Sequence, residues 1–481
     1  MRTILTSSLV GACLLVAAAC ATNPATGKRQ LMLVSEADEV QMGREADADI
    51  RKTMGVYNDP ALQKYVTDVG MRLARASHRP HLPWTFTVVD EPVVNAFALP
   101  GGFIYITRGI LPYLRNESEL AAVLGHEVGH VDARHGAAQM SKQQIAGLGL
   151  AVGSVLAPDY SDAFGLAGSA MGLVFLKFGR EAELEADRLG TRYASANNWD
   201  PGGMPGLLDT LGRIDGASST TRGIPGWAMT HPPAVDRVSK VMESVAAART
   251  PTSTVTNKAS LDQHLEGVVV GDSREKGVMR NGEFVHPVLR FGVRFPQGWD
   301  VANSDDAVVA QPTGGGGGIM LQVVGGASGN LTSTAASSMA RAGFTPIEDR
   351  VAPRSINGLD AAVGRFDGVI NQTPVSALAG FVRLTARHDV YRIMGLASSS
   401  QFGAMQAPAN ATIQSFRQLS QQEADAIQDA RITFYTVRAG DTWASIAAAA
   451  GGKVSATTLA IMNGTTADRA PAPGARIRTA R

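Results

Sequence analysis

Residues 116–135 read NESELAAVLGHEVGHVDARH, and this stretch decides how the rest of the chain is interpreted. An asparagine, a typical N-cap, opens the stretch and acidic residues follow it, which predicts a helix from Glu117 to about Arg134. Residues four positions apart on a helix are separated by only about 40° around its axis. The imidazoles of His126 and His130 therefore face the same way, and together they can bind one metal ion.

The pentapeptide His126–His130 has the form HExxH, and its second residue suggests catalysis. Glu127 lies about 100° round the helix from His126, so it cannot share that ligand position. It can instead act as the general base that takes a proton from the attacking water. A five-residue pattern with three fixed residues occurs by chance in many proteins. The surrounding sequence must therefore show whether this one binds a metal.

A catalytic zinc ion keeps three protein ligands and one open position, so a third ligand must come from elsewhere in the chain. Residues 181–187 read EAELEAD and begin a second predicted helix, which runs to about Ala196. Glu183 and Asp187 share one face of it, so one can bind the metal while the other orients a ligand histidine. The usual alternative to metal binding is that the acidic face of such a helix is simply exposed to solvent. A divalent cation also explains why four acidic residues gather there, because it relieves their repulsion.

His135 is not predicted to be a ligand. The pattern HExxHxxGxxH would place a third histidine one residue later, and Ala133 replaces its glycine. On a continuing helix His135 would lie about 140° away from His130. We expect it to be a polar residue at the C-terminal end of the helix.

Composition limits the classes of protein to which the chain can belong. Its 481 residues exceed one ordinary hydrophobic core, which predicts two to four domains. Charged residues make up 18% of the chain and the formal net charge is +1. The sequence thus lacks the basic character typical of nucleic-acid binding, and we expect no nucleic-acid partner.

The N-terminus predicts export. An arginine precedes a mostly apolar run from Ile4 to Ala19, and small residues precede Cys20. This pattern is typical of a secretory signal and is too short to span a bilayer comfortably. It resembles a bacterial lipoprotein signal, which implies that residues 1–19 are removed and that Cys20 is acylated. We then expect a periplasmic protein held by lipid at the outer membrane. Ordinary cleavage with an unmodified Cys20 is the alternative.

Around the histidine helix, residues 20–250 predict a mainly helical domain with a small sheet. Its other predicted elements are helices at 35–55 and 60–76 and strands at 84–90, 95–99 and 103–107. Two Gly- and Ala-rich apolar segments, 145–157 and 164–176, follow the histidine helix. Both are shorter than the roughly 20 residues that a membrane-spanning helix needs, so we expect buried core or lid helices.

The rest of the chain predicts three further parts and a linker. Residues 251–283 begin with a Thr- and Ser-rich stretch and are expected to be a linker, 284–415 a small β-rich domain of unknown role, and 416–434 a connecting helix. Residues 435–481 resemble a LysM module, a small fold of two helices and two strands. The matching residues are Tyr435, Val437, Gly440, Asp441, Thr442, Trp443 and Ile446. The resemblance implies binding to N-acetylglucosamine polymers such as peptidoglycan, and a module that only packs is the alternative.

Several motifs in order resemble those of the zinc endopeptidase family that includes the CAAX prenyl protease and the HtpX heat-shock protease, and most closely its periplasmic lipoprotein branch. Besides HExxH, they are Arg180 with ExEAD at 183–187, NAFALPGG at 95–102 and THPP at 230–233. The match covers about residues 20–250. It implies an α+β, multidomain protein whose first domain is a zincin-type peptidase domain.

The resemblance also assigns roles to individual residues. It implies one Zn²⁺ held by His126, His130 and Glu183, with Asp187 and Arg180 supporting these ligands. It implies that a strand comprising Phe103, Ile104, Tyr105 and Ile106 is the sheet edge against which a substrate chain lies extended. His231 is implied to lie near the metal, where it could fill the open position in a resting enzyme or support the oxyanion.

The expected function is a zinc metalloendopeptidase of the bacterial cell envelope that cleaves misfolded or misassembled proteins. Two alternatives remain at this point. One is a metallopeptidase directed to peptidoglycan through residues 435–481. The other is a non-catalytic, chaperone-like binder that keeps the metal for stability, although no structural need explains Glu127 in that case.

Overall fold

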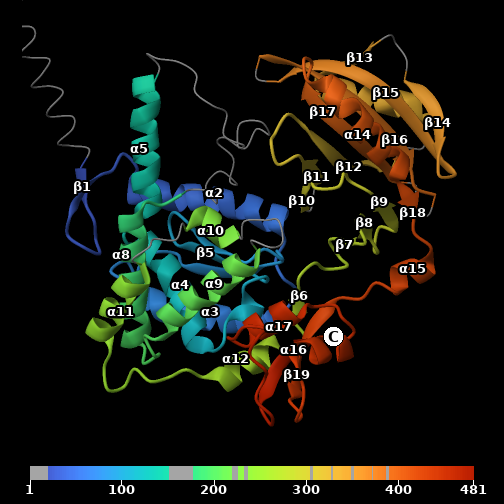
Figure 1. Ribbon diagram of the computed structural model, residues 1–481. Helices are drawn as coiled ribbons and strands as arrows, with labels where there is room; N and C mark the ends of the chain where they lie inside the picture. Colours follow the sequence, from blue (N-terminus) through green and yellow to red (C-terminus); the bar gives the residue numbers. More distant parts are fainter. Residues whose placement is uncertain are drawn as a thin grey trace, which may run out of the picture. The chain divides into compact units, whose positions relative to one another are not determined.

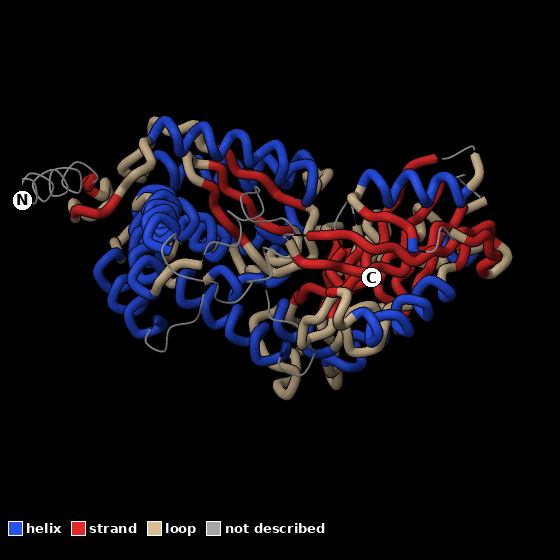
Figure 2. The backbone as a smooth tube through the Cα atoms, turned by 90° about the horizontal axis from the view of Figure 1, so that it is seen from above, coloured by secondary structure: helices blue, strands red, loops and turns tan. Residues whose placement is uncertain are grey.

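The computed structural model describes residues 20–150, 177–218, 226–231, 237–303, 307–326, 329–347, 351–370, 372–385 and 389–481. The chain forms two compact units, the first from Met1–Gly271 with Arg431–Arg481 and the second from Asp272–Ala430. Helices dominate the first unit and long strands the second (Figures 1 and 2), so the α+β, multidomain class is as predicted. The expected signal peptide 1–19 and apolar segment 164–176 lie outside the described residues, as does segment 145–157 beyond Leu150.

The first unit begins with a short hairpin and two helices that the sequence predicts. Strands β1 (Cys20–Thr22) and β2 (Arg29–Leu31) pair antiparallel. Helix α2 (Glu36–Met54) starts at a capping box formed by Ser35 and Asp38. Helix α3 (Pro60–Arg75) starts where the Asp59 side chain accepts hydrogen bonds from two backbone N–H groups. The following helices are η1 (Leu111–Tyr113), α4 (Glu117–Asp132), α5 (His135–Leu150), α8 (Arg180–Ala196), α9 (Gly203–Ser218), α10 (Gly226–Thr230), α11 (Arg237–Ala248) and α12 (Lys258–Leu265).

The small sheet beside α4 corrects one expectation. It has the order β3-β5-β4, where β3 is Thr85–Val89, β4 is Ala96–Leu99 and β5 is Phe103–Thr107. Strand β5 pairs parallel with β3 on one side and antiparallel with β4 on the other, and all five of its residues are buried. The prediction that Phe103, Ile104, Tyr105 and Ile106 form the edge was therefore wrong. The tight turn through Gly101 and Gly102, both at positive φ, folds β4 back alongside β5, so β4 and β3 are the two outer strands.

The C-terminal residues fold as the expected module of two strands and two helices, and they belong to the first unit. The module consists of β19 (Ala430–Thr436), α16 (Trp443–Ala449), α17 (Ala456–Met462) and β20 (Arg476–Ala480). Strand β19 lies between β20 and β6 (Val269–Val270) in a three-stranded sheet. Residues 251–283 are thus more than a linker, because they contain α12 and β6, which join the module to the first unit.

The second unit is a sheet domain somewhat larger than the predicted 284–415. An eight-stranded sheet has the order β10-β11-β12-β17-β16-β15-β13, with β14 also pairing β15. Its elements are β10 (Asp300–Asn303), β11 (Val308–Gln311), β12 (Gly318–Gly326), α13 (Leu331–Arg341), β13 (Phe344–Pro346), β14 (Ala352–Ile356), β15 (Leu359–Ile370), β16 (Thr373–Arg383), β17 (Asp389–Ser398) and α14 (Phe402–Ser415). Along β16 alternate side chains enter two separate cores, one with α13 and one with α14, so the two helices pack on opposite faces of the sheet.

A second, four-stranded sheet completes this unit. It contains β7 (Val278–Arg280), β8 (Glu283–His286), β9 (Phe291–Val293) and β18 (Arg417–Gln418). Within the predicted connecting helix 416–434, only α15 (Gln421–Asp425) is helical, because β18 pairs with β9 and residues from Ala430 onward form β19. This part of the prediction was wrong.

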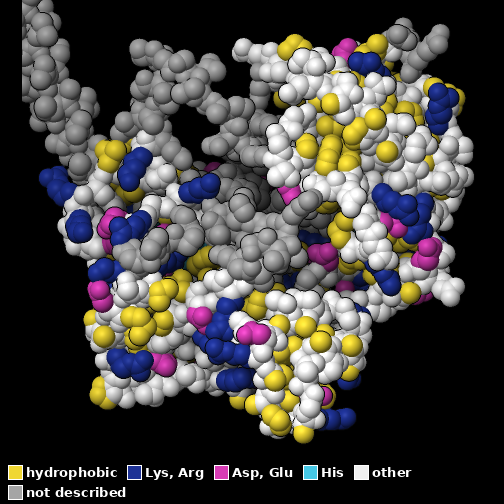
Figure 3. Space-filling model, viewed as in Figure 1, with side chains coloured by type: hydrophobic (Ala, Val, Ile, Leu, Met, Phe, Trp, Pro, Cys, Tyr) yellow, Lys and Arg dark blue, Asp and Glu magenta, His cyan; other side chains and the backbone are white. Residues whose placement is uncertain are grey.

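The described part of the chain contains no helix that is both long and apolar enough to cross a membrane. On the face shown in Figure 3, Lys and Arg side chains are interspersed with Asp and Glu side chains.

Candidate metal centre

Helix α4 carries the HExxH residues and is fixed at both ends. At its start the Asn116 side chain accepts a hydrogen bond from Glu119 N–H, at 3.1 Å. At its end Arg134 adopts a left-handed backbone conformation, with φ of 60°. All sixteen residues of the helix are buried. His126, Glu127 and His130 are therefore presented by a rigid, fully enclosed element rather than by a surface loop.

Helix α8 brings Glu183 and Asp187 to α4 because small residues let the two helices approach closely. A Cβ on Gly190 would lie only 2.7 Å from backbone atoms of α4, and one on Gly129 would lie 3.0 Å from the Ala186 carbonyl oxygen. Any larger side chain at Gly190 would force the helices apart. The close approach leaves the Glu183 carboxylate buried beside both imidazoles.

Four donor groups converge at this point: His126, His130, Glu183 and His231 each offer a ligand atom, and these atoms all lie within 4.8 Å of one another. The Nε2 atoms of His126 and His130 are 3.0 Å apart. The Glu183 carboxylate oxygens lie 3.6 Å from His126 Nε2 and 3.5 Å from His130 Nε2. His231 Nδ1 lies 3.2 Å from His126 Nε2 and 3.1 Å from Glu183 Oε1.

These separations of 3.0–3.6 Å are close to those in a tetrahedral zinc site. With zinc–ligand distances of about 2.0–2.2 Å, two ligand atoms at the tetrahedral angle lie roughly 3.3–3.6 Å apart. The donor set of imidazole nitrogens and one carboxylate is also the one that zinc prefers. The residues present therefore fit the metal, with His126, His130, Glu183 and His231 able to hold it.

The protonation states inside the site favour a cation. Burial, together with neighbouring His126, holds the pKa of His130 well below its ordinary value, which keeps the ring neutral. Burial raises the pKa of Glu183, but the opposite effect of His231, His126 and Arg237 is larger. The pKa is therefore lower than usual and the carboxylate is ionised. A neutral imidazole and an ionised carboxylate are the forms that bind a metal.

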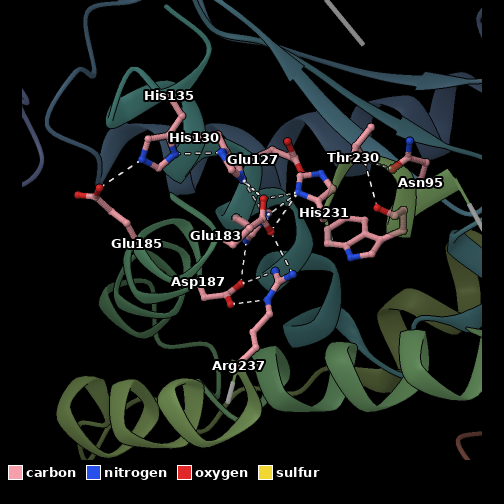
Figure 4. A network of polar contacts seen from close by, with 12 residues as sticks. Asn95, Glu127, His130, His135, Glu183, Glu185, Asp187, Thr230, His231 and Arg237 are labelled. Carbon is pink, nitrogen blue, oxygen red and sulfur yellow. Dashed lines mark hydrogen bonds and ion pairs between the residues drawn. The ribbon is translucent and has the colours of Figure 1, made fainter. Parts of the chain in front are cut away.

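Behind the cluster, Asp187 and Arg237 support the donor groups (Figure 4). Asp187 Oδ1 lies 2.9 Å from His126 Nδ1, the ring nitrogen that faces away from the cluster. Arg237 Nε donates to Asp187 Oδ2 at 2.7 Å, and its Nη1 lies 3.0 Å from Glu183 Oε2. Burial raises the pKa of Asp187, but hydrogen bonds from His126 and Arg237 outweigh it and bring the pKa to about 2.

The sequence did not predict that Arg237 lies behind the ligands. Arg180 is exposed at the start of α8. Arg237, the first residue of α11, is buried against Glu183 and Asp187. Support of the ligands by Arg180 stays a prediction. A single arginine has no spacing pattern in the sequence. The position of Arg237, a few residues after the THPP motif, was the only signal that could have indicated its role.

Glu127 and His231 lie beside each other at the cluster, and both are buried. His231 N–H donates to the Trp227 carbonyl at 2.8 Å and the Trp227 ring stacks on the imidazole, so His231 is held in place. His231 Nε2 lies 3.5 Å from Glu127 Oε1, and both atoms are buried without a hydrogen-bond partner among the described residues. The pKa of Glu127 is raised, because the effect of burial is larger than the opposite effect of His231 and His126. Residues 232–236, which include the two prolines of THPP, lie outside the described residues.

The fold and this donor cluster define the domain as a metallopeptidase domain of the HExxH type with a glutamate from a second helix. Residues 60–245 match the model of peptidase family M48, and residues 435–479 match that of the LysM domain. The chain thus carries an M48 peptidase domain and a C-terminal LysM domain, which confirms both resemblances.

Individual relatives agree with the family match. The chain is 33% identical over 222 residues to the beta-barrel assembly-enhancing protease of Escherichia coli (strain K12), which covers 44% of this chain and 44% of that protein. It is 32% identical over 204 residues to the mitochondrial metalloendopeptidase OMA1 of Arabidopsis thaliana, covering 41% and 40% of the two chains. For the OMA1 protein of Schizosaccharomyces pombe the identity is 32% over 228 residues, covering 46% and 65%. The chain spans less than half the length of the first of these relatives.

Proposed function

We propose that this protein is a zinc-dependent endopeptidase of the bacterial cell envelope that cleaves extended segments of misfolded or misassembled proteins. The observation that carries the proposal is the convergence of His126, His130 and Glu183 from two helices, with the Glu127 carboxylate beside them. The bacterial relatives are named as beta-barrel assembly-enhancing proteases, which supports substrates among the proteins of the envelope.

In this proposal each residue has a distinct task. His126, His130 and Glu183 hold the zinc ion, which when bound supplies Lewis-acid activation of water and of the peptide carbonyl. Glu127 accepts a proton from the attacking water at the buried Oε1 atom and passes it to the leaving amine. Its raised pKa suits the first step, because a carboxylate with a higher pKa is a stronger base.

Strand β4 is the proposed docking edge for the substrate backbone. Asn95 O accepts a hydrogen bond from Thr107 N–H at 3.0 Å, which fixes the pairing so that alternate residues of β4 direct their main-chain groups away from β5. Ala98 is one of these outward residues and is only partly buried. A chain added at this edge would be held by main-chain hydrogen bonds with little sequence preference, as suits cleavage of unfolded proteins.

His231 is proposed to fill the fourth position of the resting centre. Its Nδ1 atom is as close to His126 Nε2 and Glu183 Oε1 as the donor atoms are to one another. A substrate would have to displace this imidazole, so the free enzyme would be partly self-inhibited. This arrangement supports the resting-state role over the oxyanion role that the sequence also allowed.

The proposed location is the periplasm, with the lipid at Cys20 holding the protein at the outer membrane. Cys20 is the first residue of β1, and the hairpin it begins is followed by Leu33, whose N–H donates to Ser141 Oγ on α5 at 2.9 Å. A lipid at this residue would thus tether a folded domain directly. Mass spectrometry of the mature N-terminus tests it, since an unmodified residue would refute the anchor.

Cleavage of unfolded casein tests the catalytic proposal. Zinc-loaded protein is expected to cleave casein, and Glu127→Gln is expected to bind zinc equally well yet cleave at least about 100-fold more slowly, as is typical for loss of a general base. Glu181→Gln, the same substitution at an exposed glutamate on α8, serves as a control that should cleave like the parent. Equal rates for the parent and Glu127→Gln would refute catalysis and favour a chaperone-like binder.

The LysM domain supports a second candidate, in which the same centre acts on peptidoglycan peptides. Incubation with purified sacculi and analysis of the soluble products separates the two. Release of peptide fragments by the parent but not by Glu127→Gln would favour the peptidoglycan substrate, and casein cleavage without such release would favour envelope proteins.

A further inference from the structure

The two histidines of HExxH are supported in different ways on the sides of their rings that face away from the cluster. His126 Nδ1 meets the carboxylate of Asp187. His130 Nδ1 instead meets another imidazole, with His135 Nδ1 at 3.0 Å. The second nitrogen of that ring, His135 Nε2, lies 3.2 Å from Glu185 Oε2 on α8 (Figure 4). His130 and His135 are both buried, so the contact between the two rings is shielded from water, whereas Glu185 is partly exposed.

The proposed zinc site determines which groups donate and which accept in the contacts from His130 through His135 to Glu185. When His130 Nε2 donates its lone pair to a metal, the proton of the neutral ring must be on Nδ1, which therefore has to donate a hydrogen bond. His135 Nδ1 is the acceptor within reach, and His135 then carries its own proton on Nε2. That N–H donates to the Glu185 carboxylate. One arrangement of protons thus satisfies all three groups.

We propose that His135 and Glu185 are positioning residues for His130 as a zinc ligand; this inference rests on the proposed zinc site. They hold the ring of His130 in the orientation and tautomer that metal binding requires, as Asp187 does for His126. Phe178 packs on one face of His130, with ring centroids 4.2 Å apart, and restricts its tilt.

This inference also explains the acidic run of α8. Glu183 enters the donor cluster, Asp187 supports His126, and Glu185 supports His130 through His135. Three carboxylates in five residues thus serve one centre. Glu181, the fourth acidic residue of the run, is exposed. His135 lies outside the donor cluster, as expected for a residue that is not a ligand. The sequence predicted only a polar residue at the C-terminal end of the helix and did not indicate the contact with His130.

Zinc affinity of the full chain tests the inference. The apoprotein is titrated with zinc against a competing chromophoric chelator, for the parent and for His135→Ala, Glu185→Ala and His135→Asn. His135→Ala is expected to weaken zinc binding about 10- to 100-fold, the usual effect of removing a hydrogen-bond partner of a metal-bound histidine. Glu185→Ala should weaken it less. His135→Asn should stay close to the parent, because the side-chain oxygen of asparagine can replace Nδ1 as the acceptor.

Two further measurements separate positioning from general stability. The thermal unfolding of each apoprotein shows whether the fold is intact, and the visible spectrum of the cobalt-substituted forms reports ligand geometry directly. His135→Ala should alter the cobalt spectrum and His135→Asn should restore it. Glu181→Ala, which removes the exposed charge from the same helix, is the matched control and should leave both the affinity and the spectrum unchanged. If His135→Ala fails to fold, Glu185→Ala and His135→Asn decide the question in the same way.

The outcomes distinguish this inference from the proposed function. A parent protein that binds no zinc refutes the zinc site itself. A parent that binds one zinc ion, with His135→Ala and Glu185→Ala binding it within twofold of the parent and with unchanged cobalt spectra, refutes only the positioning role. Equal weakening in Glu181→Ala would also refute it.

Discussion

Replacing Arg478 with alanine should unfold the peptidase domain at a markedly lower urea concentration, although this residue lies in the LysM domain. Its guanidinium is 2% exposed. Nε lies 2.8 Å and Nη2 2.7 Å from Asp262 Oδ1 on α12, while Nη1 donates to the carbonyls of Pro112 and Leu114. Those carbonyls lie immediately before helix α4. Arg478 therefore links the last strand of the chain to the start of the helix that carries HExxH.

The expected loss follows from the groups left behind. Arg478→Ala leaves the buried Asp262 carboxylate with Lys258 as its remaining cation and leaves two carbonyls without this donor. Breaking a buried ion pair by removing one partner typically lowers the free energy of unfolding by about 3–5 kcal/mol. A loss of that size is a large fraction of the stability of an ordinary domain.

Urea unfolding followed by tryptophan fluorescence measures this loss. Four of the five tryptophans lie in the first unit, so the experiment is done in a Trp299→Phe background that removes the one in the second unit. Arg476→Ala is the matched control on the same strand. Its guanidinium is exposed and lies over the Phe434 ring, which predicts a loss below about 1 kcal/mol. Equal midpoints for the two variants would refute the predicted stabilisation by Arg478.

Three further variants test the site. His231→Ala is expected to raise the rate of casein cleavage several-fold, because the residue fills the fourth position of the resting centre; an unchanged or lower rate contradicts this role. Ala98→Pro removes one outward N–H of β4, which should lower kcat/KM for casein about fivefold, equivalent to one hydrogen bond of about 1 kcal/mol; an unchanged kcat/KM would exclude β4 as the docking edge. Asp187, with an ordinary pKa of 3.8 and a folded-state pKa of about 2, stabilises the fold above pH 3.8, and this stabilisation is lost as the pH falls toward 2. From pH 5 to pH 3 the metal-free parent should therefore lose about 1 kcal/mol more unfolding free energy than Asp187→Asn, and parallel losses in urea titrations would contradict the lowered pKa.

The local features of the site could be predicted from the sequence because their signals are local. The capping asparagine, the four-residue spacing of His126 and His130, and that of Glu183 and Asp187 each follow from the geometry of a single helix. The sequence also indicated that the helix of Glu183 must meet the helix of the histidines, because zinc needs a third ligand. The structure brings these groups together as expected.

Features that depend on the packing of distant segments could not be predicted. The central position of β5 depends on β3 pairing parallel with it, a contact that neither strand encodes by itself. Arg237 supports Asp187 from a separate helix, and Arg478 reaches Asp262 across more than two hundred residues. Such contacts follow from the folded arrangement rather than from any spacing in the chain.

A crystal structure of the zinc-loaded protein, with anomalous data at the zinc edge, tests the proposed metal site. We expect one zinc ion per chain, about 2.0–2.2 Å from His126 Nε2, His130 Nε2 and a carboxylate oxygen of Glu183. A zinc peak elsewhere, or a Glu183 carboxylate outside bonding distance of the ion, would contradict it.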